Sequence, residues 1–170
     1  MNSNKNLVFL GMMGSGKSSI GNLVSKKLNL PFTDIDSLIV EITGMSISEI
    51  FEKKGEDYFR NLEEMITLKS LKKIKNVVSL GGGGFINIKI RKEILANHFS
   101  FWLHWDESIL IKRIKDSKKR PLAFKSTDKE LRALIKNRSR IYSNAQFRIN
   151  CNKLTKTEIV KKILNIYELN

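Results

Sequence analysis

A glycine-rich octapeptide near the start of the chain places the strongest limit on how this sequence can fold. Residues 11–18 read GMMGSGKS, which matches the phosphate-binding pattern GxxxxGK[ST]. The pattern needs a strand before it and a helix after it, because its backbone N–H groups converge on phosphate oxygens at a helix N-terminus. The apolar residues within 5–10 and the helical spacing of Ile20, Val24 and Leu28 supply both. The motif therefore predicts binding of ATP or GTP.

Two side chains of this motif are candidates for the chemistry. Lys17 should reach the β- and γ-phosphates, and the hydroxyl of Ser18 should bind a Mg²⁺ that bridges the same phosphates. The alternative is a glycine turn followed by a surface lysine. Chance occurrence of the pattern in 170 residues is below about 1%, which disfavours that alternative. The motif does not identify the phosphoryl acceptor.

Short apolar runs alternate with helical patterns along the rest of the chain. A long helix is expected from about residue 55 to residue 74, because Phe59, Leu62 and Ile66 fall on one face. The alternation predicts an α/β fold of three layers, with helices on both faces of a parallel sheet. No repeat or linker divides residues 1–170, so one domain is expected. The expected strands are residues 5–10, a short strand that ends within 32–36, and residues 77–80, 99–105 and 147–151.

Two further segments carry the spacing of a helix capping box. Ser46 and Glu49 stand three residues apart, as do Thr155 and Glu158. In each pair the side chain of one residue can satisfy the backbone N–H of the other. Both pairs are therefore expected to begin helices and to have a structural role.

The charge balance narrows the choice of partners without deciding it. The chain has 31 Lys and Arg against 17 Asp and Glu, a formal net charge of +14, which attracts nucleic acids, acidic membranes or anionic metabolites. Most lysines, such as Lys26, Lys27, Lys161 and Lys162, fall on polar faces of expected helices, where they favour solubility. No aromatic–basic interleaving or recognition-helix pattern accompanies them, so no nucleic-acid partner is expected.

The cysteine and histidine content excludes two common structural devices. The single Cys151 cannot form an internal disulfide, and two histidines with one thiol give no zinc-ligand spacing. The apolar residues 7–10 are too few to span a membrane, so no membrane association is expected. A cytoplasmic location is expected from the absence of disulfides, and a monomer from the lack of an apolar stripe.

Two aspartates at the end of the second expected strand are candidates for the acceptor side. Asp34 and Asp36 could both face the nucleotide cleft. One carboxylate can hold Mg²⁺ through water, and another can orient or deprotonate an attacking hydroxyl. The structural alternative is a helix N-cap at Asp36 and a turn residue at Asp34.

A run of four glycines, residues 81–84, follows the expected strand 77–80. It lies at the carboxyl end of that strand, where ligands bind in open α/β sheets. Bare backbone there would let a small ligand approach closely, although a flexible loop is an alternative. Arg60 lies on the long helix beside Glu63 and Glu64, and taken alone it favours an ordinary helical ion pair.

Arginines in the second half of the chain are harder to rank individually. Arg113 and Arg138 lie on basic helical patterns, where arginines are usually solvated. Arg120 differs because it begins an Arg–Pro–Leu triplet in a polar, charged stretch, at about residues 117–128, between two helical patterns. Such a stretch could close over ATP as a lid, and an arginine delivered by a lid can stabilise charge on the transferring phosphoryl group.

Taken together, these motifs resemble the shikimate kinase family over nearly the whole chain. The resemblance implies a P-loop kinase fold with a five-stranded parallel sheet, similar to nucleoside monophosphate kinases, an acceptor-binding helical region at about 34–60 and a lid at about 117–128. It implies transfer of the γ-phosphoryl group of ATP to the 3-hydroxyl of shikimate, with Mg²⁺, in aromatic amino-acid biosynthesis. The likeness rests on the order and spacing of the P-loop, Asp34 and Asp36, Phe59 and Arg60 with Glu63, the glycine run, Arg120–Pro121–Leu122, and Arg138 before Tyr142.

The same resemblance implies a role for each candidate residue. Asp36 would bind the acceptor hydroxyls and is the candidate base, with Lys17 and Arg120 as the other catalytic groups. Two arginines for one carboxylate make chemical sense, because a guanidinium pairs well with a planar anion. The implied shikimate site is Asp36, Arg60, Gly81, Gly82, Gly83 and Arg138; the implied ATP site is Gly14, Ser15, Gly16, Lys17, Ser18, Ser19, Arg113 and Arg120; the implied Mg²⁺ site is Ser18 and Asp34.

Two departures from the family pattern fall at secondary positions. Residues 150–155, the region expected near adenine, lack the aspartate and proline that the family often shows, so no residue is assigned there. Gly84 replaces the usual alanine or serine, which should not change the chemistry. Gluconate or a nucleoside monophosphate is the alternative acceptor, since the P-loop and lid would serve either equally.

Overall fold

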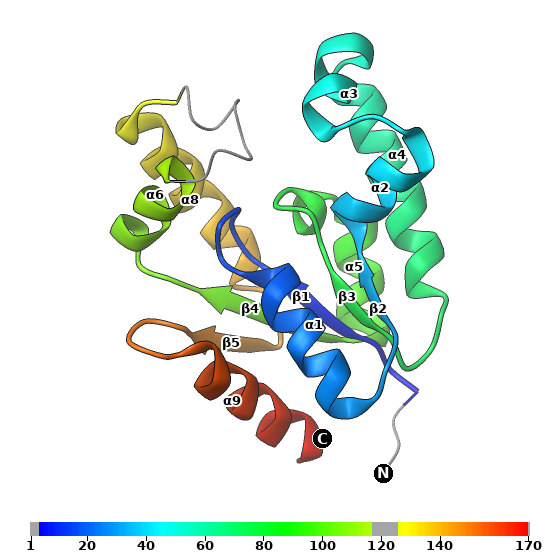
Figure 1. Ribbon diagram of the computed structural model, residues 1–170, viewed down its shortest axis with the longest axis vertical. Helices are drawn as coiled ribbons and strands as arrows, with labels where there is room; N and C mark the ends of the chain where they lie inside the picture. Colours follow the sequence, from blue (N-terminus) through cyan, green and yellow to red (C-terminus); the bar gives the residue numbers. More distant parts are fainter. Residues whose placement is uncertain (1–3, 117–125, 170) are drawn as a thin grey trace.

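A parallel sheet forms the centre of the molecule (Figure 1). The computed structural model describes residues 4–116 and 126–169, and within them the sheet has five strands in the order β2-β3-β1-β4-β5. Each pair of neighbouring strands runs parallel, which confirms the expected α/β class. The strands are β1 (Leu7–Leu10), β2 (Phe32–Asp34), β3 (Val77–Ser79), β4 (Phe99–His104) and β5 (Phe147–Asn150).

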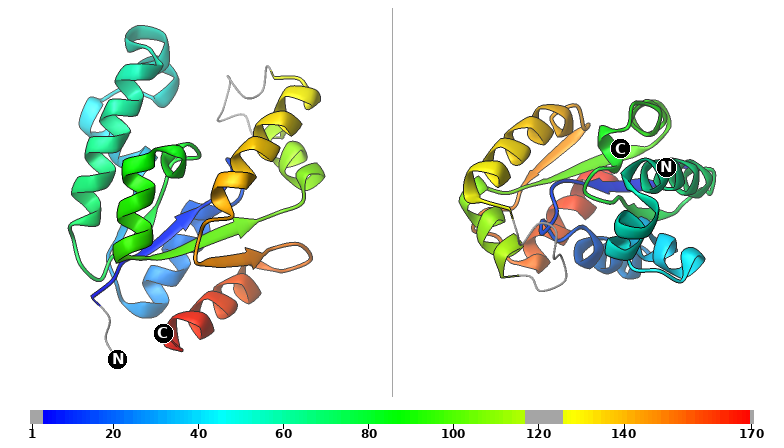
Figure 2. Two further views of the ribbon diagram at one scale, coloured as in Figure 1. Left: turned by 180° about the vertical axis from the view of Figure 1, so that it is seen from behind. Right: turned by 90° about the horizontal axis from the view of Figure 1, so that it is seen from above.

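Helices cover both faces of this sheet and give the three expected layers. The views in Figures 1 and 2 place α1 and α9 together on one face and α5 and α8 on the other. The helices α2, α3 and α4 pack against one another and form a helical lobe at one side of the sheet. The helices are α1 (Lys17–Leu28), α2 (Ile35–Thr43), α3 (Ile47–Lys54), α4 (Glu56–Leu71), the 3₁₀ turn η1 (Gly84–Ile86), α5 (Ile88–Asn97), α6 (Glu107–Lys115), α8 (Asp128–Tyr142) and α9 (Lys156–Glu168).

The middle strand, β1, is the most deeply buried element. All four of its side chains are fully buried, as expected for a strand covered on both faces. Leu7 is in register with Val77 on one side and with Phe99 on the other. Because all strands are parallel, their carboxyl ends meet at one edge of the sheet, where α/β folds bind ligands. The P-loop, the aspartates and the glycine run therefore emerge side by side.

A buried asparagine lies at the other end of the sheet, directly before β1. The Asn6 side chain donates to the carbonyls of Leu71, at 2.9 Å, and Lys73, at 2.6 Å, and accepts from the N–H of Asn76, at 3.0 Å. These bonds satisfy backbone groups left open at the end of α4. Lys75 then takes a positive φ of 52°. The long helix consequently ends three residues earlier than predicted.

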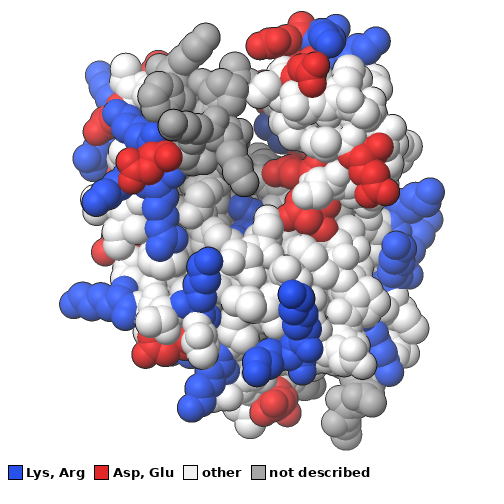
Figure 3. Space-filling view, viewed as in Figure 1, with Lys and Arg blue, Asp and Glu red and all other residues white. Residues whose placement is uncertain are grey.

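Two capping boxes confirm expected helix starts, and a third was not predicted. Ser46 begins α3 and Thr155 begins α9, each paired with its glutamate as expected. Thr127 and Glu130 form the additional box, at the start of α8. Among the residues described, no helix is both long enough and apolar enough to cross a membrane. On the face in Figure 3, Lys and Arg side chains are spread out and interleaved with acidic ones.

Candidate active site

The P-loop joins β1 to α1 in a conformation that glycine permits. Gly16 caps α1 with φ 90°, and Gly11 has φ 140°. A Cβ on Gly11 would also lie 2.9 Å from the carbonyl oxygen of Leu103, so no larger residue fits there. The side chain of Lys17 is buried, and its Nζ donates to the carbonyls of Gly11, at 2.9 Å, and Met12, at 3.1 Å. The ammonium group is therefore held across the loop.

Other predicted nucleotide residues lie around this loop. Ser18 and Ser19 are exposed in the first turn of α1, whereas Ser15 is buried. The Cβ of Arg113 lies 3.6 Å from the position that a Cβ on Gly14 would take, so α6 runs directly beside the P-loop. Arg120 and most of the predicted lid lie outside the described residues, so its predicted role stays a prediction.

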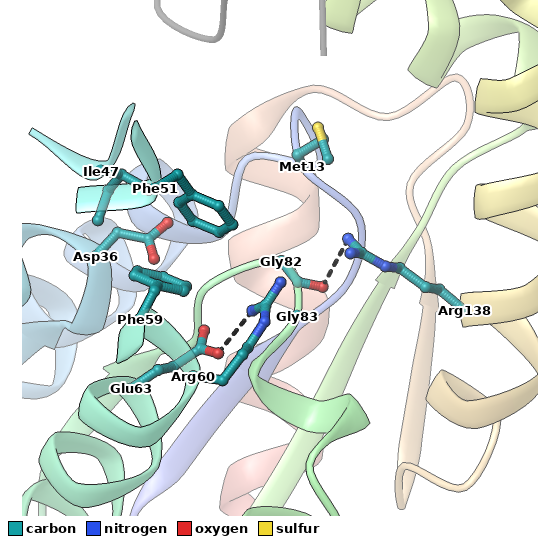
Figure 4. Close-up of a pocket in the computed structure, with 10 residues that line it drawn as sticks. All are labelled: Met13, Asp36, Ile47, Phe51, Phe59, Arg60, Glu63, Gly82, Gly83 and Arg138. Carbon is teal, nitrogen blue, oxygen red and sulfur yellow. Dashed lines mark hydrogen bonds and ion pairs between the residues drawn. The ribbon is translucent and has the colours of Figure 1, made fainter. Parts of the chain in front are cut away.

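Across from the P-loop, a small pocket of about 130 Å³ separates the helical lobe from the glycine run (Figure 4). Its walls carry two arginines and two carboxylates, together with aromatic and aliphatic side chains. Five of the residues predicted for the acceptor line it directly, from four different segments of the chain. The lining residues are Met13, Asp36, Ile47, Phe51, Phe59, Arg60, Glu63, Gly82, Gly83 and Arg138.

Arg60 is held in this pocket by two acids and two rings. Its Nη1 donates to Glu63 at 2.8 Å, and its other nitrogens donate to Glu56 at 3.2 Å. The guanidinium carbon lies 5.1 Å from the ring centre of Phe59 and 6.0 Å from that of Phe51. The ordinary helical ion pair favoured by the sequence does exist, but it serves to orient Arg60 into the pocket, as Figure 4 shows.

Gly81 marks the place where two carboxylates approach each other. A Cβ on Gly81 would lie 2.5 Å from Oδ1 of Asp36 and 2.6 Å from Oε1 of Glu63. Burial raises the pKa of the Glu63 carboxyl, which Arg60 opposes and the charge of Asp36 reinforces. Among the described residues, Oε1 of Glu63 is buried without a hydrogen-bond partner. Sequence reasoning treated Glu63 only as a neighbour of Arg60 and missed this burial.

Arg138 and Tyr142 fix the backbone of the glycine run from the other side. Nη1 of Arg138 donates to the carbonyl of Gly82 at 3.3 Å, and the hydroxyl of Tyr142 donates to the same oxygen. Burial raises the pKa of Tyr142 to about 12, so this phenol remains a donor. A Cβ on Gly83 would collide with Nη1 of Arg60. Bare backbone is therefore needed here first of all for the close approach of protein side chains.

Asp34 occupies a different position from Asp36. Asp34 is the N-cap of α2, and its Oδ1 accepts from the N–H of Ser37 at 2.9 Å. The structural alternative considered from the sequence was therefore wrong about which aspartate caps the helix. Asp36, in the first turn of α2, is the aspartate that faces the pocket (Figure 4). No cluster of three or more His, Cys, Asp or Glu that could hold a metal occurs in residues 4–116 and 126–169.

Comparison with known proteins gives a consistent answer. Residues 13–168 match the family model for shikimate kinase. The curated shikimate kinase of Thermodesulfovibrio yellowstonii is 39% identical over 166 residues, covering 96% of this chain and 95% of that protein. The structure of shikimate kinase from Acinetobacter baumannii in complex with shikimate matches with a TM-score of 0.91 and 28% identity, over 98% of this chain and 94% of that one. Deoxyadenosine kinase from M. mycoides with bound dATP, at a TM-score of 0.66 and 16% identity, covering 96% and 99%, shares the fold.

Proposed function

Because the chain belongs to the shikimate kinase family, we propose that it transfers the γ-phosphoryl group of ATP to the 3-hydroxyl of shikimate through the residues described above. It is an ATP-dependent kinase, a phosphotransferase with an alcohol acceptor, in aromatic amino-acid biosynthesis. The single observation that supports the assignment of the acceptor site is the pocket that gathers Arg60, Arg138 and Asp36 beside the glycine run. A compact molecule with one carboxylate and several hydroxyls suits this combination of charges.

In this proposal, Arg60 and Arg138 bind the carboxylate of shikimate. Guanidinium groups bind planar carboxylates well because two parallel N–H groups can meet two oxygens. Both arginines are already anchored, Arg60 by Glu63 and Glu56 and Arg138 by the carbonyl of Gly82. Anchoring in advance reduces the entropy that binding would otherwise cost. Gly81, Gly82 and Gly83 would line the ring of the substrate.

Asp36 is the proposed base. It faces the pocket from α2, where it can accept hydrogen bonds from the hydroxyls of the acceptor and receive the proton of the attacking one. The neighbouring carboxylate of Glu63 lies close enough to influence Asp36 through its charge. Positioning and charge stabilisation supply most of the rate in phosphoryl transfer, so the geometry of this hydroxyl matters more than strong basicity.

On the nucleotide side, the P-loop holds the phosphates. The N–H groups of Gly14, Gly16, Ser18 and Ser19 would surround the β-phosphate at the start of α1, where the helix dipole favours negative charge. Ser15 would hold the loop in shape between them, since its N–H donates to the carbonyl of Met12 at 3.1 Å. Lys17 would leave its loop carbonyls to reach the β- and γ-phosphates. Arg113 would lie against adenine, and Arg120 would approach the γ-phosphate from the lid. Closure of the lid would keep water from competing with shikimate.

The proposed Mg²⁺ site consists of the hydroxyl of Ser18 and the carboxylate of Asp34. Both supply hard oxygen atoms, and both lie at the carboxyl edge of the sheet, since Asp34 ends β2 in register with Ser79 of β3. Mg²⁺ in such enzymes is held by one or two protein oxygens together with phosphates, so a larger acidic cluster is not required. When bound, the ion would offset phosphate charge.

We also propose a single domain, a monomer and a cytoplasmic location. Residues 34–60 would form the acceptor-binding region and residues 117–128 the lid.

The test is a coupled assay of ADP release with ATP, Mg²⁺ and shikimate. Controls omit shikimate or replace it with gluconate or a nucleoside monophosphate. We expect ADP release that depends on shikimate and exceeds hydrolysis of ATP in its absence. ADP release with another acceptor and none with shikimate would overturn the assignment of the pocket.

A further inference from the structure

A tryptophan directly after β4 is bonded to the P-loop. Nε1 of Trp105 donates to the backbone carbonyl of Ser15 at 2.9 Å, and the bond is buried. In a trans peptide the C=O of one residue and the N–H of the next point in opposite directions. No cis peptide occurs in the described residues, so a fixed Ser15 carbonyl directs the N–H of Gly16 away from the indole. Gly16 is the N-cap of α1, where a phosphate would bind.

An arginine side chain stacks on the ring of the same tryptophan. The guanidinium carbon of Arg113 lies 3.6 Å from the ring centre of Trp105, a distance at which the two planar groups are in contact. Trp105 is only 8% exposed, whereas Arg113 is exposed. One face of the guanidinium therefore covers the indole, and the remainder of the group stays accessible beside the P-loop. A purine base can stack on such a guanidinium.

The residue after Trp105 holds the loop that follows β5. The N–H of Asp106 donates to Oδ1 of Asn152 at 2.9 Å, and Nδ2 of Asn152 donates to Oδ1 of Asp106 at 2.6 Å. The N–H of Cys151 donates to the carbonyl of His104 at 2.9 Å. Residues 150–155, for which the sequence predicted a place near adenine but no individual contact, are thereby fixed next to Trp105.

We infer that Trp105 is a positioning residue of the nucleotide site: its N–H orients the Ser15–Gly16 peptide toward phosphate, and its ring presents Arg113 to the base. The inference rests on the proposed ATP site. The inference goes beyond that site because it assigns a role to a side chain that would not touch ATP. Trp105 does not line the acceptor pocket, so its effect falls on affinity for the nucleotide.

Two conservative variants separate this role from a general effect on packing. Trp105→Phe keeps an aromatic ring but removes the N–H. Trp102→Phe is the matched control. Trp102, on β4, is buried like Trp105 and also has an arginine against its ring, since the guanidinium carbon of Arg148 is 5.0 Å from its ring centre. We expect Trp105→Phe to raise KM for ATP about fivefold, with KM for shikimate unchanged, because one buried carbonyl loses its donor. Equal KM values for ATP in the two variants would overturn the inference.

A double-mutant cycle tests whether Trp105 acts through Arg113. The affinity for ADP, measured by calorimetry, is compared for Trp105→Leu, Arg113→Leu and the double variant. If the ring supports the guanidinium, the double variant binds ADP about threefold more tightly than the product of the two single effects predicts. Strictly additive effects would show that Trp105 does not act through Arg113.

A measurement on a nearly native chain covers the case in which the Trp105 variants do not fold. In Trp102→Phe, Trp105 is the one remaining tryptophan of the chain. Its fluorescence must change when ADP saturates the site and must stay unchanged with shikimate alone. An ADP-insensitive signal would overturn the inference. Since ADP binding is read directly, these results stand apart from whether wild-type protein phosphorylates shikimate, which tests the proposed function.

Discussion

Asp36 and Glu63 approach each other around a residue that has no side chain. Oxygens of the two carboxylates lie 2.5 Å and 2.6 Å from the position where a Cβ of Gly81 would stand. Asp36 comes from α2 and Glu63 from α4, so Gly81 sets how closely the helical lobe can approach the strand β3. The acceptor pocket depends on this contact.

Replacement of Gly81 by alanine should therefore damage acceptor binding. The added methyl group must displace both carboxylates, and overpacking of this kind costs enough to weaken shikimate binding about tenfold to a hundredfold. KM for ATP should remain unchanged. The control is Gly84→Ala, where a Cβ would meet its nearest neighbour at an ordinary 3.5 Å. Steady-state kinetics with both substrates decide the outcome, and similar KM values for shikimate in the two variants would contradict the contact.

Replacement of Glu63 by glutamine should change how stability depends on pH. Burial raises the pKa of Glu63 above its ordinary value of 4.5, so the folded state holds this proton more tightly than the unfolded state does. The corresponding stability is present below pH 4.5 and is lost as the pH rises through the raised pKa. Glutamine has no proton to lose there. The melting temperature of Glu63→Gln, relative to wild type, should rise from pH 4.5 toward pH 8; a constant difference would argue against the raised pKa.

Replacement of Asp36 by asparagine should reduce turnover strongly. The amide has nearly the same shape as the carboxylate but cannot take the proton of the attacking hydroxyl. A positioned proton acceptor contributes on the order of a hundredfold or more to rate. We expect kcat to fall by about that factor while ADP still binds. Near-normal kcat in a rapid-quench or coupled assay would remove Asp36 from its proposed role.

Replacement of Lys17 by alanine should also lower kcat by about a hundredfold or more, through loss of charge stabilisation on the phosphates. Lys53→Ala is the control, since Lys53 is exposed on α3 and pairs with Glu49 at 3.4 Å. The coupled assay at saturating shikimate measures both variants. Comparable activity of the two would exclude Lys17 from catalysis.

Replacement of Arg60 by lysine tests geometry at constant charge. A lysine cannot bond Glu63, Glu56 and a carboxylate with the fixed fork of a guanidinium, so KM for shikimate should rise about tenfold to a hundredfold. Arg91→Lys is the control, because Arg91 bonds the carbonyls of Phe85 and Ile86 at 3.0 Å and 2.9 Å and does not line the pocket. A similar small rise in KM for shikimate in both variants would refute the proposed role of Arg60 in binding the carboxylate.

Much of the fold could be predicted because the local sequence patterns indicate the same strands and helices that the parallel sheet requires. The P-loop signature and the apolar runs are local, and they identified all five strands to within a few residues. The early end of α4 could not be predicted, since it depends on Asn6, which is distant in sequence and meets α4 only in the folded chain. A lone polar residue beside a strand gives no sign of such bonds.

The candidate site likewise has residues that the sequence could identify and residues whose roles depend on contacts in the folded chain. Arg60, Arg138 and Asp36 could be selected from motif order, and the structure brings them into one pocket. The burial of Glu63 could not be foreseen, because a glutamate on a helix is usually solvated. Trp105 was counted only as part of an apolar run; its bond to Ser15 joins residues ninety positions apart, a relationship that no local pattern carries.

The central place of β1 in the sheet has a consequence for synthesis. β1 is the first strand to leave the ribosome, yet its neighbours β3 and β4 begin only at Val77 and Phe99. Its four apolar residues therefore stay unpaired on the nascent chain until at least residue 79 of the 170 has been translated. During that interval the segment is a ready target for chaperones and for aggregation. The strand that completes the sheet centre in the finished enzyme is thus the one most exposed while the enzyme is being made.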